Sequence, residues 1–316
     1  AQFITRRLGA EVLRYAADPF ITGIYAGDPA TLSMRHAFGR MWNAERQHGS
    51  LIRGLLRGGA PKTPDQTDRI RPRILSFPDG LGELTGALRA ALGDRIRLSQ
   101  GTSAITRLSG EYHVTTDSGT FAAPKLISTV PAYTIAGLLR DLAPGLEAPL
   151  HSVQYPPVAV VYLGFREEQF AEVPTGFGGL IPSSEGLSTL GVIFSSSNFP
   201  GRAPEGHVLL TAIVGGARHP EIAEEPTEEI LSRTRREVMR LFPVSGEPPF
   251  EHLRLWPRAI PQYHVGYSTV LEALDWAERT NPGLHLIGNY RGGIAMGDCI
   301  RTATETAKRL VSANDA

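Results

Sequence analysis

The residues best suited to ligand binding lie in a glycine-rich segment near the end of the sequence. The run His285-Leu286-Ile287 is typical of a buried strand, and four glycines follow it, at Gly288, Gly292, Gly293 and Gly297. Glycine lets a ligand approach the backbone closely, and the free N–H groups at the start of a helix suit an electron-rich ligand edge. We expect Asp298 to open such a helix and to accept a hydrogen bond from a ligand hydroxyl. A glycine turn with Asp298 as an ordinary N-cap explains these residues equally well.

Other reactive patterns are missing from the sequence. Neither the dinucleotide fingerprint G-x-G-x-x-G nor a phosphate-binding loop occurs. The nine histidines include no H-x-x-x-H or H-E-x-x-H pair, so we expect no metal site, and residues 195–197 lack the G-x-S-x-G setting of a nucleophile elbow. The start of a helix could lower the pKa of Cys299, but a small residue packed against a strand is the better interpretation.

Composition narrows the class of protein. The 316 residues hold 32 Lys plus Arg against 32 Asp plus Glu, and this zero net charge argues against a nucleic-acid partner. A single cysteine excludes an internal disulfide and a multi-cysteine zinc site, and it favours a reducing compartment. The longest apolar stretch, 158–163, is far shorter than the ~18–20 residues of a transmembrane helix. The length predicts two or three domains, and the first residues indicate a piece of a longer chain.

Apolar side chains recur at helical spacing in the first 60 residues. We expect one helix over 10–17 that stops at Asp18-Pro19, because proline cannot continue a helix. A second helix is expected from Asp28-Pro29, with Ser33 as a later cap, and a third over 50–56. Residues 60–72, rich in Pro, Asp, Thr and Arg, are typical of a solvated connection.

Strand-like runs dominate the rest of the chain. After a short helix beyond Pro78, three runs typical of a β-meander lie at 95–98, 103–108 and 112–116. Further strands are expected at 125–130, 158–163, 191–194, 208–214 and 284–287. Amphipathic helices are expected over 224–241 and 298–311.

Four stretches of the chain, taken in order, resemble a known family. They are Asp18–Asp28 with Leu32–Arg35, Gly176–Pro182 with Leu190-Gly191 and Phe194–Ser196, Trp256–Tyr263, and Gly288–Cys299. In these residues the chain resembles the protoporphyrinogen oxidases, FAD enzymes of haem synthesis in the amine-oxidase-like flavoprotein superfamily. With the spacing between them, the four stretches cover nearly the whole chain.

The resemblance implies an α+β or α/β fold of the FAD-linked amine-oxidase type, divided into four segments. Residues 1–72 match a helical, membrane-facing domain, and residues 146–262 match a substrate domain with a mixed sheet. Residues 73–145, which include the meander, and residues 263–316 match two returning parts of a partial FAD domain. The family's N-terminal strand, G-x-G-x-x-G turn and helix, which hold the FAD pyrophosphate, have no counterpart here. We therefore expect this chain alone to bind FAD weakly or not at all.

The resemblance also assigns site residues that spacing alone does not. Contacts to FAD are implied at Thr102, Asn289, Gly293, Ile294, Ala295, Met296, Gly297 and Asp298. A wall against the substrate macrocycle is implied at Phe177, Gly178, Leu180 and Ile213. For Phe177, Leu180 and Ile213 the alternative is plain core packing.

The implied reaction is the oxidation of protoporphyrinogen IX, or of coproporphyrinogen III, to the porphyrin. FAD takes a hydride from a bridging carbon in each round, and molecular oxygen reoxidises the flavin, so no side chain is assigned as a catalytic acid or base. A flat, apolar tetrapyrrole suits an aromatic and aliphatic slot, and the family's arginine for the propionates precedes this chain. We expect a cytoplasmic protein, peripheral on the inner face of a membrane through residues 1–72, and a homodimer stays open.

Two other functions stay open beside this one. An amine oxidase of the same superfamily is the nearest, although residues 290–293 do not resemble the amine-oxidase tail. A non-catalytic remnant that binds a porphyrin is the second. Basic residues along the first helices form either a membrane-surface face or a solvated face, namely Arg35, Arg40, Arg46, Arg53 and Arg57.

Overall fold

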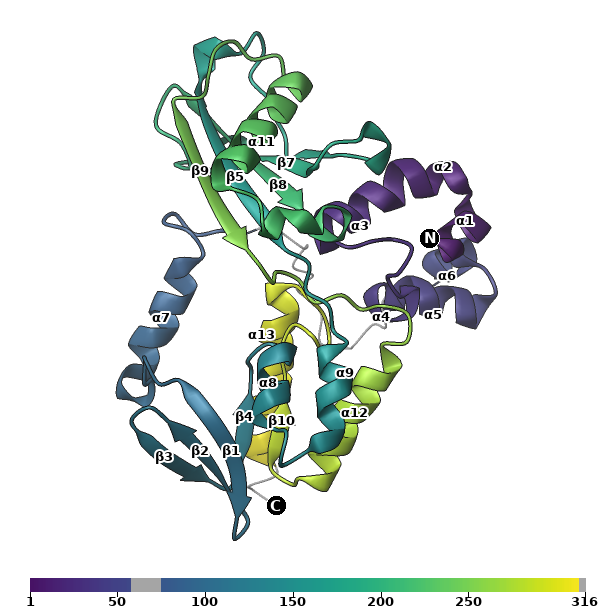
Figure 1. Ribbon diagram of the computed structural model, residues 1–316. Coiled ribbons are helices and arrows are strands. Elements are labelled where there is room, and N and C mark those ends of the chain that lie inside the picture. The colour runs from purple at the N-terminus through teal and green to yellow at the C-terminus, as the bar shows by residue number, and fades with distance from the viewer. Residues whose placement is uncertain (58–74, 313–316) are drawn as a thin grey trace. The chain divides into compact units, whose positions relative to one another are not determined.

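The computed structural model describes residues 1–57 and 75–312, and the chain divides into two compact units (Figure 1). The first unit combines residues 1–96 with 156–259, and the second combines residues 97–155 with 260–316. The chain therefore enters each unit twice. The expected connection at 60–72 lies outside the described residues.

An antiparallel sheet of five strands forms the centre of the first unit, in the order β6-β7-β8-β5-β9. The strands are β5 (Val158–Arg166), β6 (Gly178–Leu180), β7 (Thr189–Phe194), β8 (His207–Gly215) and β9 (Phe250–Trp256). Strand alternation sends Ala159, Val161 and Leu163 of β5 to one face, where they share a buried core with Ile230 and Val238. In each strand, the side chains between these core-facing positions point to the opposite face of the sheet.

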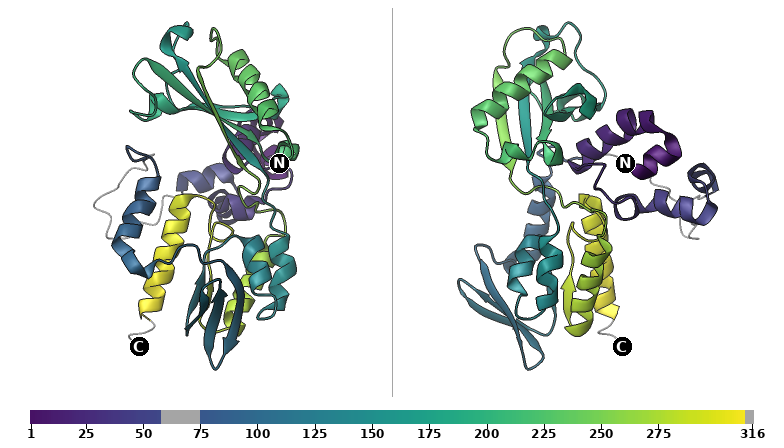
Figure 2. Two further views of the ribbon diagram at one scale, coloured as in Figure 1. Left: turned by 60° about the vertical axis from the view of Figure 1, so that its left-hand side comes forward. Right: turned by 45° about the vertical axis from the view of Figure 1, so that its right-hand side comes forward.

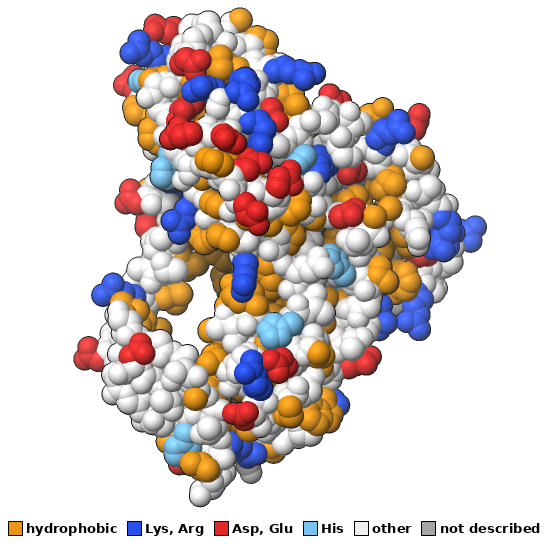
Figure 3. Space-filling model, in the orientation of Figure 1, with side chains coloured by type: hydrophobic (Ala, Val, Ile, Leu, Met, Phe, Trp, Pro, Cys, Tyr) orange, Lys and Arg blue, Asp and Glu red, His pale blue; other side chains and the backbone are white. Residues whose placement is uncertain are grey.

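The helix α11 (Thr227–Leu241) covers that core face of the sheet (Figures 1 and 2). Its apolar side packs on the strands, as the amphipathic pattern predicted, and its outer side is charged. Figure 3 shows charged side chains of both signs gathered over this helix, where Arg235 pairs with Glu251 at 3.2 Å. A short helix, α10 (Ser195–Asn198), follows β7.

In the helical part of the first unit, one helix continues past the proline at which the sequence predicted its end. Its helices are α1 (Gln2–Leu8), α2 (Ala10–Val12), α3 (Asp18–Tyr25), α4 (Met34–Ala37), α5 (Gly39–His48) and α6 (Leu51–Arg57). A π-helical turn, Leu13–Ala17, joins α2 directly to α3, so the expected end at Asp18-Pro19 is wrong. Pro19, the second residue of α3, has no N–H to donate, and the π-helical turn before it carries the helix through this position.

Two further details of this part of the chain differ from the expectations. The second helix begins at Met34 and not near Asp28-Pro29, with Ser33 at the expected N-cap position, and it is interrupted at Phe38. The expected helix after Pro78 forms as α7 (Gly82–Leu92), followed by a 3-10 turn, Gly93–Arg95. The strand expected at 95–98 does not form, because that turn occupies its start and residues 96–98 are irregular.

The second unit joins a meander to a parallel strand pair. The meander consists of β1 (Thr102–Leu108), β2 (Glu111–Thr116) and β3 (Gly119–Ala123), and the parallel pair of β4 (Leu126–Ser128) and β10 (Leu284–Leu286). The helices of this unit are α8 (Ala132–Leu138), α9 (Glu147–His151), α12 (Ser268–Thr280) and α13 (Met296–Ser312). Leu284 and Leu286 are buried, so the pair β4–β10 fixes the two chain segments of the unit to each other.

The glycine-rich tail forms a loop between strand and helix. We call residues 287–295, between β10 and α13, the glycine loop. Asp298 is the third residue of α13 and not its N-cap, because the helix already begins at Met296. The N–H of Asp298 donates to the carbonyl of Ala295 at 2.9 Å. Among the described residues, no helix is long and apolar enough to cross a membrane.

Candidate cofactor and substrate sites

Two expected substrate-wall residues lie in one row across the sheet face opposite α11. Leu180 pairs with Gly191, Gly191 with Ile213, and Ile213 with Val160, on strands β6, β7, β8 and β5. Cross-strand partners share a face, so these residues form a continuous surface with no side chain at Gly191. Leu180 is 43% exposed, and Ile213 and Val160 are half-buried. This apolar row can receive a flat apolar ligand.

Leu180 sits between two glycines. A Cβ on Gly23 of α3 would overlap Cδ2 of Leu180, and a Cβ on Gly191 would lie 3.0 Å from the same atom. Neither neighbour therefore has room for a side chain without displacing Leu180. The two glycines set the position of the leucine at the edge of the row.

The backbone conformation at position 178 requires glycine, whether or not a ligand binds there. Its φ is 143°, and a Cβ would overlap the carbonyl oxygen of Val192 on the neighbouring strand. Phe177 precedes it and is 52% exposed, and its carbonyl accepts hydrogen bonds from the Phe194 N–H at 3.1 Å and Asn198 Nδ2 at 2.8 Å. The backbone around Phe177 is thus well held while its ring stays accessible.

Asp18 fixes the connection between β6 and β7. Its Oδ2 accepts a hydrogen bond from the Ser183 N–H at 2.7 Å and lies 3.3 Å from the Arg218 guanidinium. Arg218 also donates to the Thr22 hydroxyl at 3.2 Å. Burial lowers the pKa of Arg218 and the Asp18 carboxylate opposes that shift, so the guanidinium stays charged. The hydrogen bond from Ser183 thereby ties α3 to the strand connection that follows Leu180, and the ion pair ties α3 to the turn after β8.

In the second unit, two tyrosines hold the glycine loop. The Tyr263 hydroxyl donates to the carbonyl of Asn289 at 2.7 Å and accepts from the Gly293 N–H at 3.0 Å. The Tyr267 hydroxyl donates to the carbonyl of Tyr290 at 2.6 Å, and the ring centroids of Tyr263 and Tyr267 lie 4.6 Å apart. Three loop residues are therefore tied to one aromatic pair.

Gly293 and Asp298 pack too closely for any other residue at position 293. The φ of Gly293 is 133°, and a Cβ there would overlap the carboxylate of Asp298. That carboxylate accepts a hydrogen bond from Arg301 at 2.6 Å. The side chain of Asp298 is thus engaged within the protein, between the loop and its own helix.

Comparisons with known proteins identify the family of the chain. The family model for flavin-containing amine oxidoreductases matches residues 1–311. The chain belongs to the flavin-containing amine oxidoreductase family. The family expected from the four sequence stretches and its α+β fold are therefore confirmed.

Relatives of this chain include enzymes named for the oxidation of porphyrinogens. The chain is 37% identical to the chloroplastic protoporphyrinogen oxidase of Nicotiana tabacum, over 98% of this chain and 61% of that protein. It is 29% identical to the coproporphyrinogen III oxidase of Bacillus subtilis, over 95% of this chain and 64% of that protein. A crystal structure assigned to a protoporphyrinogen oxidase of Exiguobacterium sp. 255-15 matches with a TM-score of 0.79 and 24% identity, over 98% of this chain and 66% of that one. The chain thus spans about three fifths of the length of the first relative.

The expected flavin contacts at residues 295–297 lie where the backbone is accessible. Ala295 and Gly297 are exposed and Met296 is 49% exposed, at the start of α13. The N–H groups of Met296 and Gly297, the first two of this 17-residue helix, have no intrahelical acceptor, and they lie at the positive end of the helix dipole. Ring nitrogens and carbonyl oxygens of a flavin match such donors.

Two further predictions concern Thr102 and Cys299. Thr102 is exposed at the start of β1, in a different sheet from β10, and stays a prediction. Cys299 is the fourth residue of α13 and is half-buried, and burial, assisted by the neighbouring Asp298 carboxylate, raises the pKa of its thiol. The pKa-lowering effect of the helix start is therefore outweighed, and the packing of Cys299 against a strand stays a prediction.

Sequence reasoning missed the residues that position the site. Tyr263 ended one of the four family stretches but had no assigned role, and Gly23 and Asp18 lay in another such stretch. None of them is recognisable from spacing, because their partners lie 26 to 165 residues away. The glycine at position 23 offered one signal, since glycine within a helix lowers its stability without a packing reason.

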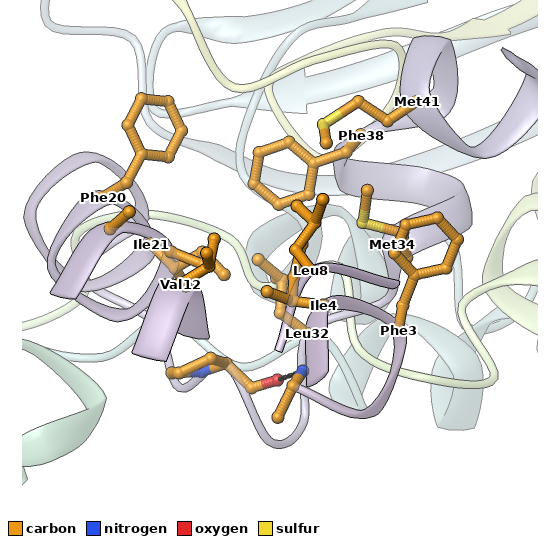
Figure 4. Close-up of a pocket in the computed structure, with 14 residues that line it drawn as sticks. Phe3, Ile4, Leu8, Val12, Phe20, Ile21, Leu32, Met34, Phe38 and Met41 are labelled. Carbon is orange, nitrogen blue, oxygen red and sulfur yellow. Dashed lines mark hydrogen bonds between the residues drawn. The ribbon is translucent and has the colours of Figure 1, made fainter. Parts of the chain in front are cut away.

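The helical part of the first unit also contains an open apolar cavity of about 370 Å³ (Figure 4). The labelled lining residues are Phe3, Ile4, Leu8, Val12, Phe20, Ile21, Leu32, Met34, Phe38 and Met41. Beside it, Trp42 packs on Phe3 with ring centroids 6.3 Å apart, so Trp42 belongs to the small core of this part. The side chain of Arg57 lies outside the described residues.

Proposed function

We propose that this chain contributes the substrate wall and the flavin-ring contacts of an FAD-dependent porphyrinogen oxidase. Its substrate would be protoporphyrinogen IX or coproporphyrinogen III, and its electron acceptor molecular oxygen. The observation that carries the proposal is the apolar row Leu180–Gly191–Ile213–Val160, in a chain whose relatives include oxidases of both substrates. A tetrapyrrole presents a flat apolar surface that matches this row.

On the cofactor side, the glycine loop and the start of α13 would hold the flavin ring. The flavin supplies the redox chemistry, as acceptor of a hydride from the substrate. Asn289 and Gly293 are held by Tyr263, and their backbone presents a fixed surface to the ring. Ile294, Ala295 and Met296 would pack against it and exclude water, and the helix dipole favours electron density on the ring edge.

On the substrate side, the chain's own residues bind and orient. Leu180 and Ile213 contact the macrocycle, and Gly191, buried beside the Leu180 side chain, leaves room for that leucine at the edge of the row. The exposed ring of Phe177 supplies a further apolar contact. Residues 1–57 carry exposed apolar side chains, and these support a peripheral membrane contact of the helical part. Leu8, Val12 and Phe20 line the cavity of Figure 4, and Tyr15, Ile24 and Ile52 are exposed elsewhere on the helices.

Porphyrin binding by the purified chain tests the proposal. We expect protoporphyrin IX to bind with a shifted Soret band, and Leu180→Ala to weaken binding about five- to tenfold, because part of a leucine side chain leaves the contact. Leu241→Ala is the matched control, since Leu241 is 37% exposed at the end of α11, on the other face of the sheet. If the wild type and both variants bind protoporphyrin IX with equal affinity, the porphyrin does not contact Leu180 and the assigned wall is wrong. If the wild type binds no porphyrin at all, the proposal is overturned.

A further inference from the structure

The apolar row on the sheet ends in a cation. Val160 of β5 pairs with Arg254 of β9, so Arg254 continues the row Leu180–Gly191–Ile213–Val160 on the same face. Four strand spacings of about 4.8 Å place it roughly 19 Å from Leu180 along the row. The surface that we assign to the substrate is thus apolar over most of its width and positive at its β9 edge.

The charges of this face have one sign. Neither Asp nor Glu occupies the face opposite α11 in strands β5 to β9. Glu251 of β9 points to the other face, where it pairs with Arg235. Arg166 shares the face with Arg254, but it lies at the far end of β5 and pairs with Glu168 at 3.5 Å.

Arg254 is exposed and available to an anion. Its guanidinium lies 5.0 Å from the ring centroid of Trp256, two residues on along the same edge of the sheet. This stacking restricts the side chain while its N–H groups stay free to donate. Within the part of the chain that the structure describes, no carboxylate forms an ion pair with Arg254.

We propose that Arg254 binds a carboxylate of the substrate, which makes it a determinant of specificity for acidic tetrapyrroles. The inference rests on the proposed function, because it places the macrocycle on the row and its flexible carboxylate arms at the β9 edge. A guanidinium fork matches a carboxylate in two parallel hydrogen bonds. The competing explanation is that a charge on an edge strand only prevents pairing with another sheet, and it predicts no effect on ligand choice.

The test compares protoporphyrin IX with its dimethyl ester, which keeps the macrocycle and removes both negative charges. We expect the wild-type chain to bind the diacid about tenfold more tightly than the ester, with a difference that shrinks as salt is added. Arg254→Gln should bind both ligands with the affinity that the wild type has for the ester. Arg240→Gln, which removes an exposed arginine of α11, should keep the preference for the diacid.

The outcomes separate the two proposals. A preference for the diacid that survives in Arg254→Gln overturns the role of Arg254 and leaves the proposed function intact. Loss of ester binding in Arg254→Gln also overturns it, because the variant would then have damaged the apolar wall. Failure of the wild type to bind either macrocycle overturns the proposed function and this inference with it.

Discussion

A single hydroxyl, that of Tyr263, connects the two ends of the loop that we assign to the flavin. It serves as donor to Asn289 and as acceptor for Gly293, so both hydrogen-bonding capacities of the phenol are used. Tyr263 is 5% exposed, and its loss would leave the half-buried Asn289 carbonyl and the half-buried Gly293 N–H without this partner. Loss of a hydrogen-bond partner away from bulk water costs free energy, so this residue stabilises the loop although no reacting atom is assigned to it.

Tyr263→Phe should loosen the glycine loop without unfolding the chain. We expect amide hydrogen exchange in a peptide covering the loop to accelerate about tenfold, because the N–H of Gly293 loses its acceptor. Tyr15→Phe is the control, since Tyr15 is 60% exposed on the helical part. Unchanged exchange in the loop of Tyr263→Phe would show that the hydroxyl does not restrain it.

Individual residues differ in how far the sequence could predict them. Leu180 and Gly293 were assigned by family resemblance, and each lies where close packing of neighbours gives its position a physical reason. Tyr263 could not be found in this way, because a hydrogen bond to a residue 26 positions away leaves no periodic signal. Asp298 was placed at the wrong point of its helix, because glycine and methionine extended α13 by two residues.

At the scale of elements, α3 and the strand pair β6–β7 act together on the substrate wall. Gly23 leaves room for the Leu180 side chain, and Asp18 accepts the hydrogen bond from Ser183 that holds the connection between the two strands. The helix therefore determines where Leu180 lies, although it carries no predicted ligand contact.

Gly23→Ala should alter ligand binding more than stability. The new methyl group meets only the flexible end of Leu180, which we expect to turn toward the ligand and to weaken protoporphyrin IX binding severalfold. Alanine also favours the helix by about 0.5–1 kcal/mol, so the melting temperature should change little. Gly86→Ala in α7 is the control, because a Cβ there meets nothing within 4 Å. The double variant Gly23→Ala/Leu180→Ala should bind no worse than Leu180→Ala alone, and an additive loss would contradict this coupling.

The sequence predicts elements that have a strong hydrophobic periodicity. It does not predict elements whose formation depends on an unusual local backbone or on the presence of a neighbouring strand. The strands β5, β7 and β8 and the helix α11 follow alternating or amphipathic patterns that packing on one core requires. The helix junction at Pro19 failed as a prediction because a π-helical turn lets the chain continue. The run at 95–98 failed because strand-forming residues alone do not supply a neighbouring strand.

The two units of the whole molecule differ in their buried ionisable groups. In the first unit the buried pair Asp18–Arg218 is ionic. In the second unit burial raises the pKa of four tyrosines, and that of Tyr155 rises to about 12; the four are Tyr112, Tyr155, Tyr267 and Tyr290. Tyr112 and Tyr290 are 1% and 0% exposed, so a phenolate at either position would lack solvent.

This difference predicts that alkaline pH destabilises the second unit through its tyrosines. In the unfolded chain a phenol ionises near its ordinary pKa of about 10, whereas the folded unit keeps these four protonated to higher pH. Above about pH 10 the unfolded state therefore binds fewer protons than the folded one, and stability falls as the pH rises. Below that pH the four groups make no pH-dependent contribution, because both states carry the proton.

Ultraviolet titration of tyrosinate, followed together with circular dichroism, measures the effect. The exposed tyrosines should ionise first with the fold intact, and the remaining absorbance should appear only as the helical signal is lost. Tyr267→Phe is the informative variant, since it removes one late-ionising phenol together with its hydrogen bond to Tyr290. Part of the late absorbance should disappear in this variant. Smooth ionisation of all nine tyrosines at about pH 10, with the fold unchanged, would contradict the burial argument.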